Sequence, residues 1–257
     1  IGVYSVGIGL GASISAGMSI PLQQLFFGSW KWSLAAWSGL ALIALLFWHY
    51  AMKRTAAAND VAPAEKEARL PWTNKRAWVL LAFFGLQSAL FYSTAAWFAP
   101  IVQEAGMSRF ESGTLVLFFA LVQMLFGLVI PLLMNVYPAR RPWMVGCCLA
   151  VLLGLVWLGL FPGHWVWAQA FVVGIGLGGL FPIGLMLPLD ETSSPQEAGA
   201  WTAMMQTGGY LISCLAPVLT GYLRDVTGGY GYSFVFWIVL SVALLAIALG
   251  YGNKQGR

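Results

Sequence analysis

The chain has 257 residues, of which 60% are hydrophobic and only 9% are charged. A typical soluble domain has roughly 25% charged residues, because its surface must be solvated. With 13 Lys and Arg against 9 Asp and Glu, the net charge is +4. This composition excludes a disordered chain, a disulfide-rich secreted domain, a coiled coil and an ordinary soluble enzyme, and it indicates a membrane protein.

Long uncharged runs predict the membrane-spanning segments. A helix needs about 20 apolar residues to cross a hydrocarbon layer roughly 30 Å thick. The runs between charges reach this length, and the longest, 142–189, is divided by the turn signal Phe161-Pro162-Gly163-His164-Trp165. Because the runs lack the alternation of barrel strands, they predict helices. We expect an all-α polytopic membrane bundle of about eight transmembrane helices, at 3–25, 33–52, 77–100, 112–134, 143–161, 166–188, 198–220 and 232–250.

The positions of the basic residues predict the orientation of these helices. Most of the Lys and Arg residues lie in 53–76, at Arg140 and Arg141, and in the C-terminal tail, which share one side if the eight helices alternate. The opposite side receives Lys31, Arg109 and Arg224. By the positive-inside rule, both ends of the chain are expected in the cytoplasm. The net charge therefore reflects topology, and no nucleic-acid site is needed to explain it.

One long polar stretch divides the chain. Residues 53–76 are rich in Ala, Pro and charge and have no apolar periodicity, which is typical of a linker. We therefore expect three parts: two helices in 1–52, a cytoplasmic linker at 53–76 and a six-helix bundle in 77–257. Four further helices in front would make the arrangement symmetric. Because Ile1 starts an apolar run without the charged region of a signal peptide, we expect the chain to begin within a longer protein.

Glycines inside the predicted helices indicate close packing. Gly174, Gly176 and Gly179 match the dinucleotide fingerprint G-x-G-x-x-G, but they lie in the middle of an uncharged span. Small residues in lipid instead let two helix backbones approach, so we expect Gly174 and Gly178 at a helix contact. Gly7 and Gly11 begin a stripe of small residues that recurs every four positions, and this stripe predicts another such contact.

Residues for catalysis or metal binding are scarce. The predicted spans contain no ionisable side chain except His49, which lies near a helix end, and Cys147, Cys148 and Cys214 lack metal-ligand spacing. Asp190 and Glu191 are expected in a solvated turn that also holds helix-capping residues. No base is placed to activate a serine. We therefore expect no enzyme activity, no metal and no cofactor.

Uncharged polar residues within the spans are better candidates for a site. Thr202, Gln206, Tyr210 and Ser213 are spaced by 4, 4 and 3 residues and therefore share one helix face. A polar face is costly in lipid, so it should line a cavity or form hydrogen bonds between helices. Further polar residues lie in the third and fourth predicted spans: Gln87, Ser88, Tyr92, Ser93, Thr94 and Gln123. Both interpretations remain open for these groups.

The whole chain resembles the C-terminal two-thirds of a major facilitator superfamily transporter, beginning at that family's fifth helix. The resemblance is carried by the glycine-rich stretch from Gly7 to Pro21, by Trp30-Lys31-Trp32-Ser33-Leu34, by the linker and by the stretch from Pro217 to Gly228. Ala139-Arg140-Arg141 keeps only the basic end of a family loop motif and lacks its acidic residue. Within the superfamily, the chain is similar to the cyanate/2-nitroimidazole transporter branch at Ser33 to Trp37, Gly179 to Pro182 and Met205 to Tyr210.

The resemblance implies two six-helix bundles that rock about a site near the membrane midplane. It implies that the first, third, fourth, sixth and seventh spans of this chain line the cavity. The expected substrate-binding residues are Gln87, Tyr92, Gln123, Thr202, Gln206 and Tyr210. Gly208 and Gly209 are expected to permit close packing or bending.

The expected function is secondary active transport of a small solute across the bacterial cytoplasmic (inner) membrane by a permease that is monomeric when full length. Spans without charges favour a neutral or weakly polar solute. The expected partners are this solute and the lipid bilayer. The alternative is a structural or assembly subunit of the membrane without transport, in which the buried polar residues pair across helices.

Overall fold

The computed structural model describes residues 2–56 and 69–252, and its regular structure there is entirely helical. The nine helices of these residues are α1 (Gly2–Leu25), α2 (Trp30–Ala56), α3 (Lys75–Glu104), α4 (Arg109–Val136), α5 (Arg140–Leu160), α6 (Val166–Glu191), α7 (Pro195–Ser213), α8 (Leu215–Thr227) and α9 (Gly231–Gly250). Within the described chain, six helices are long and apolar enough to cross a membrane, namely α2 to α6 and α9. The predicted all-α, polytopic helical fold is therefore confirmed.

The chain divides into two compact units, residues 14–67 and residues 1–13 together with 68–257. A turn joins α1 to α2, and Gly28 adopts a φ of 81° in it, a conformation that glycine reaches without strain. Of the linker expected at 53–76, residues 57–68 lie outside the described residues. The division of the chain into 1–52 and 77–257 therefore stays a prediction.

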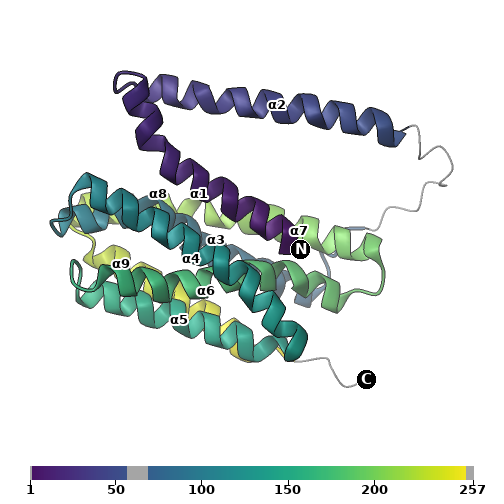
Figure 1. The fold of residues 1–257 in the computed structure, drawn as a ribbon. Coiled ribbons are helices and arrows are strands. Elements are labelled where there is room, and N and C mark those ends of the chain that lie inside the picture. The colour runs from purple at the N-terminus through teal and green to yellow at the C-terminus, as the bar shows by residue number, and fades with distance from the viewer. Residues whose placement is uncertain (1, 57–68, 253–257) are drawn as a thin grey trace. The chain divides into compact units, whose positions relative to one another are not determined.

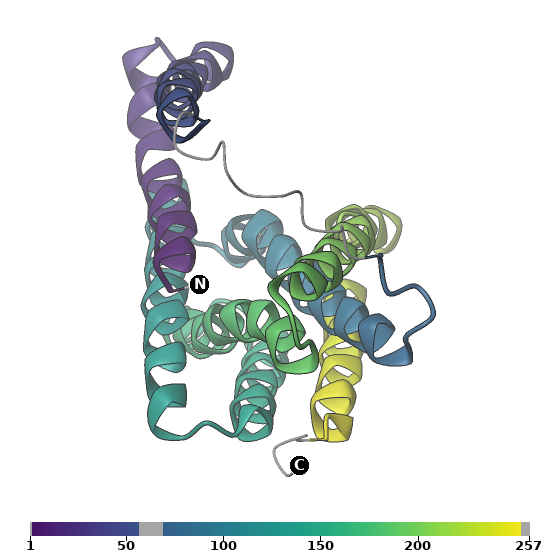
Figure 2. The ribbon, with the colours of Figure 1, turned by 90° about the vertical axis from the view of Figure 1, so that its right-hand side faces the viewer.

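Helices α3 to α9 form the bundle that holds the site (Figures 1 and 2). Helix α6 is apolar on all sides and is buried along most of its length, as expected for a helix in the middle of a bundle. It packs against α3, α4, α5 and α7, while α3 also packs against α8 and α9. The expected turn at 161–165 is present between α5 and α6.

The span expected as one helix at 198–220 is divided in the structure, and this corrects the prediction. Helix α7 ends at Ser213, Cys214 follows, and α8 begins at Leu215. Pro217 has no N–H to donate to the carbonyl of Ser213, and its ring crowds that carbonyl. The Ser213 hydroxyl donates to the Tyr210 carbonyl at 3.0 Å, and the Cys214 thiol donates to the Leu211 carbonyl at 3.1 Å. These side-chain bonds compete with the helix ladder at the break.

Ion pairs tie helix ends together at one end of the bundle. Asp190 and Glu191 are the last residues of α6 and not a solvated turn as expected. Acidic residues are unfavourable at a helix C-terminus, because the helix dipole is negative there. Arg76 pairs with Glu191, whose side chain is only 2% exposed, and Nε of Arg140 lies 2.8 Å from Asp190 Oδ2. The starts of α3 and α5 are thereby held against the end of α6.

A second group of charges lies where α3 and α8 end. Arg224 NH2 donates to Glu104 Oε2 at 3.3 Å, and its guanidinium lies 5.5 Å from the ring centroid of Tyr230. Burial raises the pKa of the Tyr230 hydroxyl, and the positive charge of Arg224 opposes this increase. Ion pairs therefore join the helices at the two ends of the bundle, whereas the middle of the bundle is uncharged.

Candidate functional site

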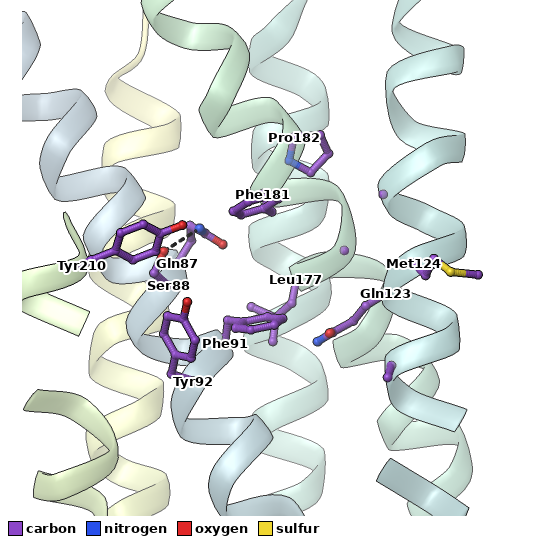
Figure 3. Close-up of a pocket in the computed structure, with 13 residues that line it drawn as sticks. Gln87, Ser88, Phe91, Tyr92, Gln123, Met124, Leu177, Phe181, Pro182 and Tyr210 are labelled. Carbon is purple, nitrogen blue, oxygen red and sulfur yellow. Dashed lines mark hydrogen bonds between the residues drawn. The ribbon is translucent and has the colours of Figure 1, made fainter. Parts of the chain in front are cut away.

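A cavity of about 140 Å³ lies between α3, α4, α6 and α7 (Figure 3). This volume exceeds the roughly 10–15 Å³ that one water molecule needs and is below the roughly 300–1,000 Å³ of drug-sized sites. Its lining residues are Gln87, Ser88, Phe91, Tyr92, Ala120, Gln123, Met124, Gly127, Leu177, Gly178, Phe181, Pro182 and Tyr210. This cavity is the candidate functional site.

Helical spacing explains why these residues line one space. Each of α3, α4 and α6 contributes residues separated by one, three or four positions, which lie on one face of a helix. Gln87, Ser88, Phe91 and Tyr92 of α3 show this pattern. Helix α7 adds Tyr210 from near its end, just before the break at Cys214.

The structure brings together four of the six predicted substrate-binding residues. Gln87, Tyr92, Gln123 and Tyr210 all line the cavity, although they come from three different helices. Thr202 and Gln206 are half-buried on α7 and are not among the lining residues. The cavity therefore uses only the end of the polar face of α7, next to the break. A role in substrate binding stays a prediction for all six residues.

Aromatic rings surround the polar groups of the cavity. Tyr210 packs edge-on against Phe84, with ring centroids 5.3 Å apart, and its ring centroid lies 6.3 Å from that of Tyr92. Phe91 lies edge-on to Tyr92 at 5.2 Å. Rings held in this way offer faces and edges to a flat solute.

The two amides extend into the cavity from facing helices, Gln87 from α3 and Gln123 from α4 (Figure 3). Gln87 is only 1% exposed, and its Nε2 donates to Ser88 Oγ at 2.8 Å within the same helix. Gln87 Oε1 and Gln123 Nε2 are buried and have no hydrogen-bond partner among the described residues. Two residues of the cavity wall thus hold one buried acceptor and one buried donor that the described residues leave unpaired.

Glycines bring the backbones of the cavity helices close together. A Cβ added at Gly178 would lie 2.5 Å from the carbonyl oxygen of Gln123, and one at Gly174 would lie 2.8 Å from Val122 Cγ1, so α6 lies directly against α4. A Cβ at Gly209 would lie 2.8 Å from Phe84 Cδ1, and one at Gly208 would collide with Leu81, so α7 lies against α3. These contacts set the width of the cavity.

Gly7 and Gly11 of α1 make no such contact with the described residues. A Cβ at Gly7 or Gly11 would meet nothing within 4 Å in the described part of the chain. The helix contact expected for Gly7 and Gly11 therefore stays a prediction.

Several lining residues were not predicted, and they are mostly apolar. Phe91, Ala120, Met124, Leu177 and Phe181 look like ordinary membrane residues in the sequence. Helical spacing could have indicated some of them. Phe91, Ala120 and Gly127 lie three or four positions from Gln87 or Gln123 and therefore share a helix face with one of these glutamines. The cavity residues on α6 have no polar residue beside them on the same helix face, so the polar pattern of the sequence gives no reason to predict them.

The residues that line the cavity are polar, apolar or aromatic. None of the residues that line the cavity is charged. In the parts of the chain that the structure describes, no three His, Cys, Asp or Glu residues come together to hold a metal ion. The polar groups that line it are amides and hydroxyls, and aromatic rings lie beside them.

Three curated relatives align with 95–100% of this chain. It is 31% identical over 258 residues to the uncharacterized transporter YycB of Bacillus subtilis. This alignment covers 100% of this chain and 63% of that protein. It is 33% identical over 251 residues to the cyanate transport protein CynX of Escherichia coli, or 95% of this chain and 62% of that protein. It is 28% identical over 255 residues to the 2-nitroimidazole transporter of Escherichia coli, or 99% and 64%.

The chain thus spans a little less than two-thirds of the length of these relatives. Its residues 1–217 match the family model described as Major Facilitator Superfamily. Apolar helices and this match agree with an integral membrane protein. The chain belongs to the major facilitator superfamily.

Proposed function

We propose that the protein is a secondary transporter that carries a small uncharged solute across the bacterial cytoplasmic membrane by alternating access. The observation that carries this proposal is the cavity between α3, α4, α6 and α7, which is lined by amides, hydroxyls and aromatic rings and by no charged residue. In such folds, two bundles rock about a site near the midplane of the membrane. The relatives named as transporters support the same conclusion.

The distribution of basic residues supports an orientation with both ends of this chain in the cytoplasm. With both chain ends in the cytoplasm, the pairs of Arg76 with Glu191 and of Arg140 with Asp190 lie at the cytoplasmic end of the bundle. The pair of Arg224 with Glu104 then lies at the outer end. The cavity sits between them, in the uncharged middle.

The alternative of a structural subunit is less well supported. Such a subunit has no use for a cavity, and its buried amides should pair across helices. Gln87 Nε2 instead donates to Ser88 Oγ within α3, and Gln123 Nε2 has no partner among the described residues.

Flux into proteoliposomes that contain the full-length protein tests the proposal. Labelled 2-nitroimidazole and cyanate are suitable first probes, because they are the solutes named for two relatives. The uncharged cavity should favour the neutral probe over the anion. Tyr92→Ala or Tyr210→Ala should lower uptake about tenfold, because each removes a ring from the cavity wall.

Tyr222→Ala is the matched control, because Tyr222 is 62% exposed on α8 and lies outside the cavity. It should transport like the unmodified protein. If all three variants show equal uptake when equal amounts of protein are present in the membrane, this cavity is not part of the transport path.

A further inference from the structure

Two buried polar atoms of the cavity have no partner, and this needs a physical explanation. The described residues contain five buried side-chain nitrogen or oxygen atoms without a hydrogen bond, and two of them are Gln87 Oε1 and Gln123 Nε2. An unpaired polar group that is shielded from water costs free energy, so native proteins keep few of them. Each one that remains needs a specific explanation, such as a functional role or a bound water or ion.

The amide nitrogens of two other glutamines in the bundle donate to groups in another part of the chain. Gln169 Nε2 donates to the carbonyls of Trp157 and Phe161 across the turn between α5 and α6, although Gln169 Oε1, which lies away from the cavity, is also buried without a partner. Gln103 Nε2 donates to Ser112 Oγ and joins α3 to α4 near their ends. Gln87 and Gln123 differ, because both line the cavity and neither of their unused atoms reaches a group on another helix.

The two unused atoms are chemically complementary. Gln87 Oε1 is an acceptor and calls for an N–H, whereas Gln123 Nε2 is a donor and calls for a carbonyl oxygen. They are presented from α3 and α4, with Phe91 and Phe181 among the rings that line the space (Figure 3). A flat solute with an N–H and a C=O group could satisfy both amides while it stacks on the rings.

We propose that Gln87 and Gln123 form an amide clamp that selects flat, uncharged solutes with adjoining N–H and C=O groups, such as lactams and other cyclic amides. This inference rests on the proposed function, because it names the substrate class of the same cavity. Gln87 Oε1 accepts from the N–H of the solute, and Gln123 Nε2 donates to its carbonyl oxygen. Anions and cations are disfavoured, because the lining residues offer no charge to pair with them.

Binding of a matched set of small ligands to the full-length protein in detergent tests the clamp. The parent probe is 2-pyridone, which is flat and carries both groups. N-Methyl-2-pyridone lacks the N–H, 2-thiopyridone has a poorer acceptor, and 3-methyl-2-pyridone adds the same methyl volume but keeps both groups. We expect N-methyl-2-pyridone and 2-thiopyridone to bind about fivefold or more weakly than 2-pyridone, and 3-methyl-2-pyridone to bind nearly as well.

Three variants assign each bond to its residue. Gln87→Met should bind 2-pyridone about fivefold more weakly and should no longer distinguish it from N-methyl-2-pyridone. Gln123→Met should lose the distinction between 2-pyridone and 2-thiopyridone. Gln103→Met removes an amide that lies outside the cavity, and it should keep the affinities of the unmodified protein for all four ligands.

The proposal is overturned if 2-pyridone does not bind, or if both cavity variants keep the same ligand preferences as the unmodified protein. Flux is measured separately with the probes of the transport assay. If the protein transports a probe but lacks these ligand preferences, the clamp proposal is wrong and the transport proposal stands. If it shows the preferences but transports no probe, the clamp proposal stands and the transport proposal is wrong.

Discussion

At the scale of single residues, the cavity depends on glycines, whose lack of a side chain lets neighbouring helices approach closely. Gly178 is buried in α6, and a Cβ there would lie 2.5 Å from the carbonyl oxygen and 2.8 Å from the Cα of Gln123. These are backbone atoms, so they cannot move aside as a flexible side chain would. The same close approach positions Gln123 in the cavity wall.

We expect Gly178→Ala to lower the free energy of unfolding by about 1–3 kcal/mol, because it overpacks the contact between α6 and α4. Thermal unfolding of the detergent-solubilised protein measures this loss. Gly146→Ala on α5 is the control, because a Cβ there meets nothing within 4 Å, and it should leave stability unchanged or slightly higher. Equal melting temperatures for the two variants would contradict the tight contact.

At the scale of elements, the break between α7 and α8 shapes the site. Prolines inside α1, α3, α4 and α6 leave those helices continuous. At Cys214, by contrast, the missing N–H of Pro217 coincides with two side-chain bonds to neighbouring carbonyls. Trp97 Nε1 of α3 donates to the Pro217 carbonyl at 2.9 Å and holds the start of α8 in place. The break thus lies one turn beyond Tyr210, at the edge of the cavity.

Pro217→Ala should restore a backbone hydrogen bond to the Ser213 carbonyl and join α7 to α8. Amide hydrogen exchange at 213–220 should slow about tenfold, which corresponds to about 1.4 kcal/mol of local opening free energy. Pro100→Ala serves as the control, since α3 is already continuous across that proline, and exchange at 213–220 should not change. Exchange that stays fast in Pro217→Ala would show that Pro217 does not cause the break.

At the scale of the whole molecule, charge placement determines how the protein sits in the membrane. Charged residues gather at the helix ends, where Arg76 and Arg140 pair with the end of α6 and Arg224 pairs with Glu104. The middle of the bundle carries the uncharged cavity. Since charged side chains are costly in hydrocarbon, this pattern places the helix ends at the two membrane surfaces.

Thiol labelling across α5 tests the predicted topology. In a background in which Cys147, Cys148 and Cys214 are replaced by Ala or Ser, His164→Cys should react with a membrane-impermeant reagent in intact cells. Ala139→Cys should react only after the cells are permeabilised, because the basic end of α5 is expected in the cytoplasm. The reverse result would invert the orientation, and labelling of both positions from outside would contradict a membrane-spanning α5.

The sequence by itself determined the class of protein and the places of most helices. Membrane-spanning helices can be read from uncharged runs, because the cost of a charge in lipid acts on each residue separately. For the same reason Gln87 and Gln123 stood out as polar residues within apolar runs. Their inclusion among the predicted site residues also used the resemblance to the transporter family, which implies that the third and fourth spans line a cavity.

Only the tertiary structure decided which residues share the cavity. Phe91, Leu177 and Phe181 line it although they look like lipid-facing residues, whereas Gln206 lies outside it although it shares a polar face with Tyr210. Whether a residue lines the cavity depends on how its helix is rotated about its axis and on how closely Gly178 and Gly209 let the backbones approach. These properties are set by contacts between distant segments, and a local pattern of hydrophobicity contains no information about them.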